Sequence, residues 1–262
     1  MPEPLPEDPL RLRSRTAFVS FSLYLRWYLH RNFNAVRVSR SGFPPDPIGR
    51  PLIICSNHPS WWDPAMFIVL SRALLRGRIG FGPMDAAALA RYRFMRRVGV
   101  FGIEPGRRGA ARFLRDGVRI LSHPQAALWI TAEGAFTDPR TRPLRLRPGI
   151  AHLARRVPHA VIVPLALEYP FWNERFPEAL VRFGPPVVLN PADGIEEVTE
   201  ALQAALAETM DALAAESIAR DPGGFQLVLS GRAGVGGVYD LWRRGVALSQ
   251  GQRFDPHHEP GA

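Results

Sequence analysis

Short apolar runs alternate with amphipathic helical patterns along most of this 262-residue chain. The apolar runs at 51–56, 127–131 and 160–167 are continuous rather than alternating, which is typical of strands buried on both faces of a parallel sheet. The expected strands are 35–41, 51–56, 79–81, 100–104, 127–131 and 160–167, with edge strands at 180–183 and 186–189. The expected helices are 63–75, 86–97, 109–121, 148–156 and 195–220. This order predicts an α/β fold with a largely parallel central sheet flanked by helices.

The two ends of the chain differ in composition from its middle. Residues 1–34 are predicted to form a tail followed by an amphipathic helical segment, and 35–222 form the α/β domain. Residues 223–262 read as a glycine-rich tail, with a short amphipathic helix expected at 238–248 and a disordered end at 257–262.

The charge of the chain restricts its chemistry. The net charge is +9, and all 33 basic residues are arginine, because no lysine occurs. Schiff-base catalysis and the lysine-containing phosphate loop are therefore excluded. Guanidinium groups bind phosphate and carboxylate bidentately, so the expected partners are anionic: lipid head groups, nucleic acid or a phosphorylated carrier.

The segment 17–29, AFVSFSLYLRWYL, is rich in aromatic residues and is flanked by arginines. It suits a helix that lies in a membrane interface with Trp27 and Tyr28 at head-group depth, but an ordinary buried amphipathic helix fits it equally well. No run reaches the roughly 18 apolar residues of a spanning helix. Cys55 is the single cysteine, and no signal peptide is apparent. We therefore expect peripheral attachment to the cytoplasmic side of the cell membrane.

The stretch ICSNHPSWWDP, residues 54–64, places His58 five residues before Asp63 at the end of an expected strand. One interpretation is structural: Ser60 caps the following helix, and Asp63 completes a capping box. The other is chemical: the histidine accepts a proton from a hydroxyl, and the aspartate holds the imidazole in the required tautomer. The two interpretations are compatible, because one carboxylate can serve both purposes.

This histidine has no nucleophile of its own in the chain. No G-x-S-x-G elbow is present, and Cys55 lies within an apolar run, where a thiol is buried and inert. The attacking group would then be a hydroxyl of the substrate. The remaining histidines show no metal-ligand spacing, so no metal site is predicted; they are His30, His123, His152, His159, His257 and His258.

Four blocks of the sequence together resemble the phospholipid/glycerol acyltransferase family, whose best-known members are lysophosphatidate acyltransferases. NHPSWWDP (57–64) is similar to the family's N-H-x-x-x-x-D block, and RVGVFGIEPG (97–106) to its second block. WITAEGAF (129–136) resembles the third block, usually F-P-E-G-T-R, and VIVPLAL (161–167) the fourth, a hydrophobic strand ending in proline. Pro164, like His58, Glu104 and Glu133, is expected at or just after a strand end. The four blocks occur in the family's order, and the resemblance covers about 51–189.

The resemblance implies an O-acyltransferase that moves a fatty acyl group from an acyl thioester, on coenzyme A or acyl carrier protein, to a lipid hydroxyl. His58 would be the general base and Asp63 its partner. The residues implied in substrate binding are Glu104, Arg107, Arg108, Glu133, Gly134, Phe136 and Pro164. No cofactor is implied, since the thioester is a substrate.

Two positions depart from the family pattern. Pro105 follows Glu104 where the second block commonly has an arginine, and Phe136 stands where the third block has one. Those arginines are credited with holding glycerol phosphate, so the acceptor of this chain is expected to be a neutral or glycosylated lipid alcohol rather than lysophosphatidate. Arg107, Arg108 or Arg140 could instead restore the phosphate clamp.

Two competing functions follow from the same sequence. A catalytically silent lipid-binding relative would keep the fold and the basic surface, but it would not need His58 and Asp63 together. A nucleic-acid-binding protein is suggested only by the arginine content, without a recognition motif.

Overall fold

The computed structural model describes residues 8–47, 49–234, 242, 245–249 and 251. The strands are β1 (Ala35–Ser39), β2 (Leu52–Ser56), β3 (Ile79–Asp85), β4 (Val100–Ile103), β5 (Ala126–Thr131), β6 (Val161–Glu168), β7 (Glu178–Phe183) and β8 (Phe225–Ser230). The helices are α1 (Pro9–Leu12), α2 (Arg15–Asn32), α3 (Asp63–Leu74), α4 (Ala86–Arg91), α5 (Gly106–Leu121), α6 (Gly149–Arg156) and α7 (Ile195–Ala219), with 3₁₀ turns η1 (Arg93–Val98) and η2 (Pro222–Gly224).

Within this part of the chain, eight strands form one sheet in the order β4-β3-β5-β2-β6-β7-β1-β8. Strands β4, β3, β5, β2 and β6 are parallel to one another, and β7 also pairs in parallel with β1. The antiparallel pairs are β6 with β7 and β1 with β8. The predicted α/β fold with a largely parallel sheet is confirmed.

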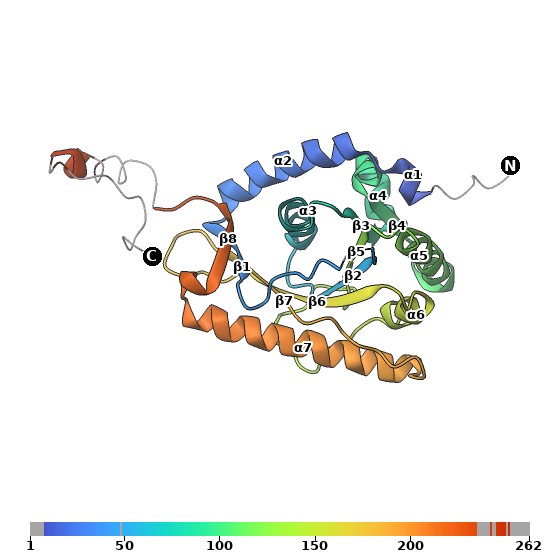
Figure 1. The fold of residues 1–262 in the computed structure, drawn as a ribbon. Helices are drawn as coiled ribbons and strands as arrows, with labels where there is room; N and C mark the ends of the chain where they lie inside the picture. The colour runs from blue at the N-terminus through green and yellow to red at the C-terminus, as the bar shows by residue number, and fades with distance from the viewer. Residues whose placement is uncertain (1–7, 48, 235–241, 243–244, 250, 252–262) are drawn as a thin grey trace.

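Helices cover both faces of the sheet (Figure 1), with α2 and α3 on one face and α5, α6 and α7 on the other. Successive residues of β2 supply both cores: Ile54 packs with the α2/α3 core and Cys55 with the α5–α7 core. This division follows from the twofold alternation of side chains along a strand. It explains why the sequence of β2 is continuously apolar.

The segments after β6 differ most from the sequence-based expectations. The strand expected at 180–183 is present as β7, but it lies inside the sheet between β6 and β1 and not at an edge. The segment expected as a strand at 186–189 makes only an isolated bridge between Ile162 and Val187. The edge strand at this end of the sheet is β8, which the sequence did not indicate; it pairs with β1. The helix expected at 238–248 falls largely on residues outside the described set, as does the expected disordered end at 257–262.

The N-terminal helical segment is present as α2, which packs against α3 and η1. Its buried side chains are Phe18, Ser22, Leu25 and Leu29, spaced at helical intervals. Trp27 on the other side is 51% exposed, whereas Tyr28 is half-buried with its ring 5.4 Å from that of Trp62. Among the described residues, no helix is both long enough and apolar enough to cross a bilayer.

Candidate active site

The central strand β2 places His58 at the carboxyl edge of the sheet. β2 lies between β5 and β6 and ends at Ser56, two residues before His58. In open α/β sheets, ligands bind at loops that leave the carboxyl ends of the strands. The His58 side chain keeps 16% of its surface accessible.

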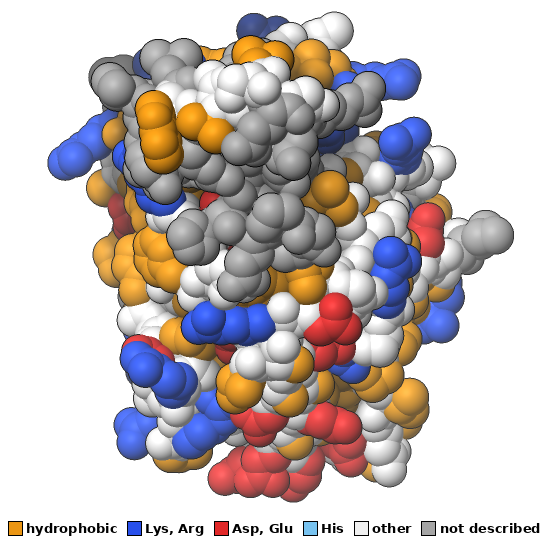
Figure 2. Space-filling model, turned by 90° about the vertical axis from the view of Figure 1, so that its left-hand side faces the viewer, with side chains coloured by type: hydrophobic (Ala, Val, Ile, Leu, Met, Phe, Trp, Pro, Cys, Tyr) orange, Lys and Arg blue, Asp and Glu red, His pale blue; other side chains and the backbone are white. Residues whose placement is uncertain are grey.

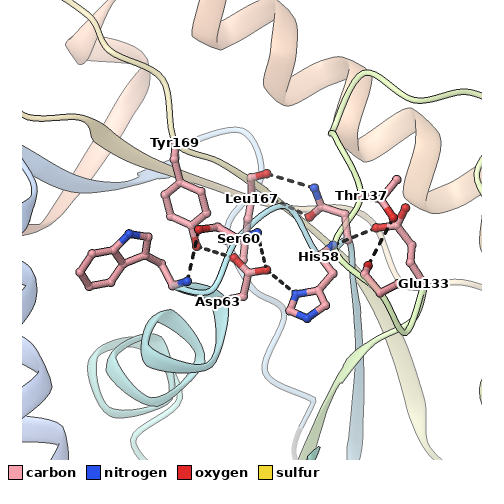
Figure 3. A network of polar contacts seen from close by, with 10 residues as sticks. His58, Ser60, Asp63, Glu133, Thr137, Leu167 and Tyr169 are labelled. Atoms are coloured by element: carbon pink, nitrogen blue, oxygen red, sulfur yellow. Dashed lines mark hydrogen bonds and ion pairs between the residues drawn. The ribbon is translucent and has the colours of Figure 1, made fainter.

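His58 and Asp63 form a direct pair (Figure 3). The His58 Nδ1 lies 2.6 Å from Asp63 Oδ2, and Asp63 has no exposed surface. Because a carboxylate can only accept, Nδ1 carries the proton, and in the neutral imidazole Nε2 is left with its lone pair free. The arrangement therefore presents a base at the open side of the ring.

Asp63 also serves the start of α3, as the structural interpretation proposed. Its Oδ2 accepts a hydrogen bond from the backbone N–H of Ser60 at 3.2 Å, which fixes the turn before the helix. The N-cap residue is Trp62, and the Ser60 hydroxyl accepts from the Trp62 N–H. The expected capping box of Ser60 and Asp63 is thus wrong, although Asp63 contacts both Ser60 and His58.

Two side-chain anchors join the His58 loop to the end of β6. The Asn57 side chain donates to the Leu167 carbonyl at 3.0 Å and accepts from the Leu167 N–H at 2.9 Å. Two residues further on, the Tyr169 hydroxyl donates to Asp63 Oδ1 at 2.7 Å. Burial, with the nearby negative charge of Asp63, raises the pKa of Tyr169 well above its usual value.

Sequence analysis missed both anchors. Asn57 is adjacent to His58 within the same block, so its polarity beside an apolar strand was an available signal. Tyr169 lies 106 residues from Asp63, and nothing in its local sequence indicates the contact.

The loop after β5 holds the backbone of His58 from the other side. The carboxylate of Glu133, which is 7% exposed, accepts from the His58 N–H at 2.9 Å. The Thr137 N–H donates to the His58 carbonyl at 3.0 Å. Gly134 adopts φ +67°, and a Cβ there would lie 2.9 Å from Cγ of Arg147. Both the backbone conformation and the close side chain therefore favour glycine at this position.

An aromatic ring lies beside the imidazole where the family pattern has an arginine. The Phe136 ring lies 4.4 Å from the His58 ring, centroid to centroid, and is 62% exposed. Trp61, on the same loop as His58, is 68% exposed. The mouth of the site is therefore apolar at these two positions.

The second sequence block lies further along the sheet. Glu104 follows β4, which is three strands from β2, a distance of roughly 14 Å at about 4.8 Å per strand. Arg107 and Arg108 are exposed in the first turn of α5. Arg140 forms an ion pair with Asp138 at 2.6 Å. Of the arginines considered for a phosphate clamp, none makes a contact with the His58–Asp63 pair.

The sequence placed Pro164 at a strand end, but the structure places it elsewhere. It sits inside β6, buried and paired in register with Cys55. A Cβ on Gly184 would come within 2.6 Å of the Pro164 ring, so Pro164 packs closely against the segment after β7. Cys55 beneath the site is buried, and burial together with the charge of Glu133 raises the pKa of its thiol to about 12. The expectation that this thiol is inert is supported, because it stays protonated at neutral pH.

Chemically, the arrangement is an imidazole whose proton is held by a carboxylate, and among the described residues no serine, threonine or cysteine side chain hydrogen-bonds to its ring. In the part of the chain that the structure describes, no group of three or more His, Cys, Asp or Glu residues could hold a metal ion. His58, Asp63, Glu133 and Phe136 come together as predicted, joined by Asn57 and Tyr169.

Comparison with known proteins identifies the family. The family model described as Acyltransferase matches residues 32–168, just over half of the 262-residue chain. The match begins at the end of α2 and stops at the last residue of β6, so it includes His58, Asp63 and Glu133. Among curated proteins, the comparison found no match. The chain therefore belongs to the phospholipid/glycerol acyltransferase family.

Proposed function

We propose that this acyltransferase moves a fatty acyl group from a thioester to a lipid hydroxyl, with His58 as the general base. The observation that carries the proposal is the 2.6 Å hydrogen bond between His58 and the buried Asp63 at the end of the central strand. A silent lipid-binding relative would have no use for a buried carboxylate paired with a partly accessible imidazole, because burying a charge is costly.

The step needs only the groups present in the site. The substrate oxygen attacks the thioester carbonyl carbon while its proton moves to Nε2 of His58, and Asp63 stabilises the imidazolium that forms. When the tetrahedral intermediate collapses, the carbon–sulfur bond breaks and the imidazolium returns the proton to the leaving thiolate. General-base help of this kind contributes about 10²–10⁴-fold to the rate.

The donor is a fatty acyl thioester of coenzyme A or of acyl carrier protein, and the acceptor is a neutral or glycosylated lipid alcohol. Support for the acceptor comes from Phe136, whose ring lies against the imidazole where the family pattern has an arginine. A phosphate monoester carries nearly two negative charges and needs guanidinium partners to offset its desolvation. An apolar ring suits a sugar face or a hydrocarbon instead.

Substitution of His58 tests the chemistry. Wild type and His58→Ala are incubated with labelled acyl-CoA and a total lipid extract, and acylated products are identified by mass spectrometry. His152→Ala is the matched control, because His152 is an exposed histidine on α6. We expect His58→Ala to lose acyl transfer and to keep its fold by circular dichroism. Activity of His58→Ala within a few-fold of wild type would remove His58 as the base.

We also propose that the protein attaches peripherally to an anionic membrane through the face formed by α2 and η1. Large apolar side chains on this face are half-exposed: Leu23 51%, Tyr24 51%, Trp27 51% and Phe94 50%. Arg15, Arg26 and Arg31 project from the same helix, which contains no acidic residue. Exposed aromatic residues bordered by arginines favour an interfacial position at an anionic surface.

The opposite face of the molecule has the opposite charge. α7 contains no basic residue and carries Glu196, Glu197, Glu200, Glu208, Asp211 and Glu216. Acidic side chains gather at the lower end of the molecule in Figure 2, where α7 lies, whereas α2 crosses the upper end in Figure 1. This asymmetry supports an orientation with α2 toward anionic lipid and α7 away from it.

A further inference from the structure

We infer that Tyr169 is a positioning residue for acyl transfer, and that its hydroxyl fixes the Asp63 carboxylate in the orientation in which Oδ2 holds the His58 proton. This inference rests on the proposed role of His58 as the base. Tyr169 lies one residue beyond the segment that the family model matches, so the match itself gives it no role.

The hydrogen bonds of Asp63 show why the hydroxyl matters. Asp63 has no exposed surface, and a buried carboxylate must find donors for both oxygens. Oδ2 accepts from His58 Nδ1 and from the Ser60 N–H. Among the described residues, the only hydrogen bond to Oδ1 comes from Tyr169. Without that bond, one oxygen of a buried charge is left unpaired and the carboxylate is free to rotate about its Cβ–Cγ bond.

Tyr169 is itself held in place. Its ring lies 5.7 Å from the ring of Phe33, at the end of α2, centroid to centroid. Its backbone follows Leu167, which the Asn57 side chain fixes through two hydrogen bonds. Figure 3 shows the Tyr169 hydroxyl pointing at Asp63 from the side opposite to His58. Because burial and the Asp63 charge raise its pKa, Tyr169 stays protonated over the working pH range and acts only as a donor toward Asp63.

The hydroxyl also sets how strongly Asp63 attracts the imidazole proton. A carboxylate that accepts one donor fewer is a stronger acceptor for the remaining ones, so it stabilises the His58 imidazolium more. Loss of the Tyr169 hydroxyl should therefore raise the pH at which His58 becomes the free base. The acid limb of kcat/KM should move to higher pH, while loss of orientation should lower the plateau.

Tyr169→Phe tests this directly, with Tyr28→Phe as the matched control. Tyr28 belongs to the same aromatic cluster, where its ring lies 5.4 Å from that of Trp62, but its hydroxyl has no bond to Asp63. We expect Tyr169→Phe to lose about tenfold or more in kcat/KM at neutral pH, as for a lost hydrogen bond to a charged group, and to shift the acid limb upward by about half a pH unit or more. Tyr28→Phe should keep the wild-type pH profile.

A second variant covers the case in which Tyr169→Phe does not fold. Site-specific 3-fluorotyrosine at position 169 keeps the shape of the ring and makes its hydroxyl a stronger donor, so the acid limb should shift to lower pH. A wild-type profile in the fluorinated protein, or in a folded Tyr169→Phe whose melting temperature alone falls, overturns the inference. Full activity of His58→Ala would instead overturn the proposed function, which is a separate result.

Discussion

At the scale of single residues, Asp63 makes contacts that belong to both of the interpretations that the sequence offered. It accepts from the Ser60 N–H at the start of α3 and from His58 Nδ1, with one oxygen shared by both donors. Substitutions that keep one function and remove the other can therefore separate stability from catalysis.

Asp63→Asn should lower kcat/KM by about 10²–10⁴-fold with a small loss of stability. The amide oxygen can still accept from Ser60, but the neutral side chain no longer stabilises the imidazolium and favours the wrong tautomer. Asp63→Ala should lose the hydrogen bond to the Ser60 N–H as well, which costs about 1 kcal/mol or more in the free energy of unfolding. Steady-state kinetics and thermal unfolding of both variants measure the difference. Near wild-type kinetics of Asp63→Asn would contradict the catalytic role of Asp63 and leave only its structural role.

Phe136 is the residue expected to decide the acceptor. Phe136→Arg should raise kcat/KM for lysophosphatidate relative to a neutral lipid alcohol, because a guanidinium beside His58 can bind the phosphate. Phe136→Leu is the matched control, since it removes the ring without adding charge. The measurement is steady-state kinetics of each protein with both acceptors.

One result would contradict this prediction. If wild type prefers lysophosphatidate and Arg107→Ala abolishes that preference, an arginine of α5 moves into the site and the acceptor carries a phosphate.

At the scale of elements, β8 closes the edge of the sheet beside β1. Its residues alternate only partly in burial: Phe225 and Leu229 are 3% and 5% exposed, whereas Leu227 is 52% exposed. Phe225 also lies 5.9 Å from Trp172, ring to ring. The strand therefore belongs to the core of the domain even though it follows α7 in a glycine-rich segment.

Two leucines of β8 give a matched pair of variants. Leu229→Ala should destabilise the protein by about 2–5 kcal/mol, because a buried side chain is removed and leaves a cavity. Leu227→Ala on the same strand should change the free energy of unfolding by less than about 0.5 kcal/mol. Denaturant unfolding followed by circular dichroism measures both. Equal effects of the two substitutions would mean that β8 does not pack on the sheet in solution.

At the scale of the whole molecule, charge is distributed unequally over the two helical layers. The chain carries +9 overall, yet α7 contains six acidic residues and no basic one. The arginines of α2 are on the other side of the sheet. Under the proposed membrane attachment, a field of this shape orients the protein at the charged surface before any apolar contact forms.

Binding to anionic vesicles should follow from this asymmetry and weaken as salt is raised. Each arginine near the surface contributes about 1 kcal/mol, which added salt screens. Leu23→Ser on α2 should weaken binding measured by sedimentation, whereas Ile218→Ser, an exposed residue at 81% on α7, should not. Binding to neutral vesicles that equals binding to anionic vesicles at all salt concentrations would contradict the electrostatic contribution. Equal effects of the two serine substitutions would remove α2 as the contact face.

Local sequence was sufficient to predict most of the architecture and the central pair of the site. A strand buried on both faces must be continuously apolar, so β2, β5 and β6 were visible in the sequence. His58 and Asp63 are five residues apart on one loop and helix start, so their contact depends only on local geometry. The sequence could therefore place His58 and its carboxylate partner side by side without knowledge of the rest of the fold.

Tertiary structure alone decided the features that depend on residues far apart in the chain. Tyr169 meets Asp63 across 106 residues, and β7 lies inside the sheet only because β1 and β8 pair beyond it. Pro164 and Glu104 looked alike in the sequence, both near strand ends, yet one is inside β6 and the other lies three strands from His58. The spacing of apolar residues in a segment indicates which of its faces are buried. The order in which strands pair depends on contacts between residues that are far apart in the sequence and meet only in the folded chain.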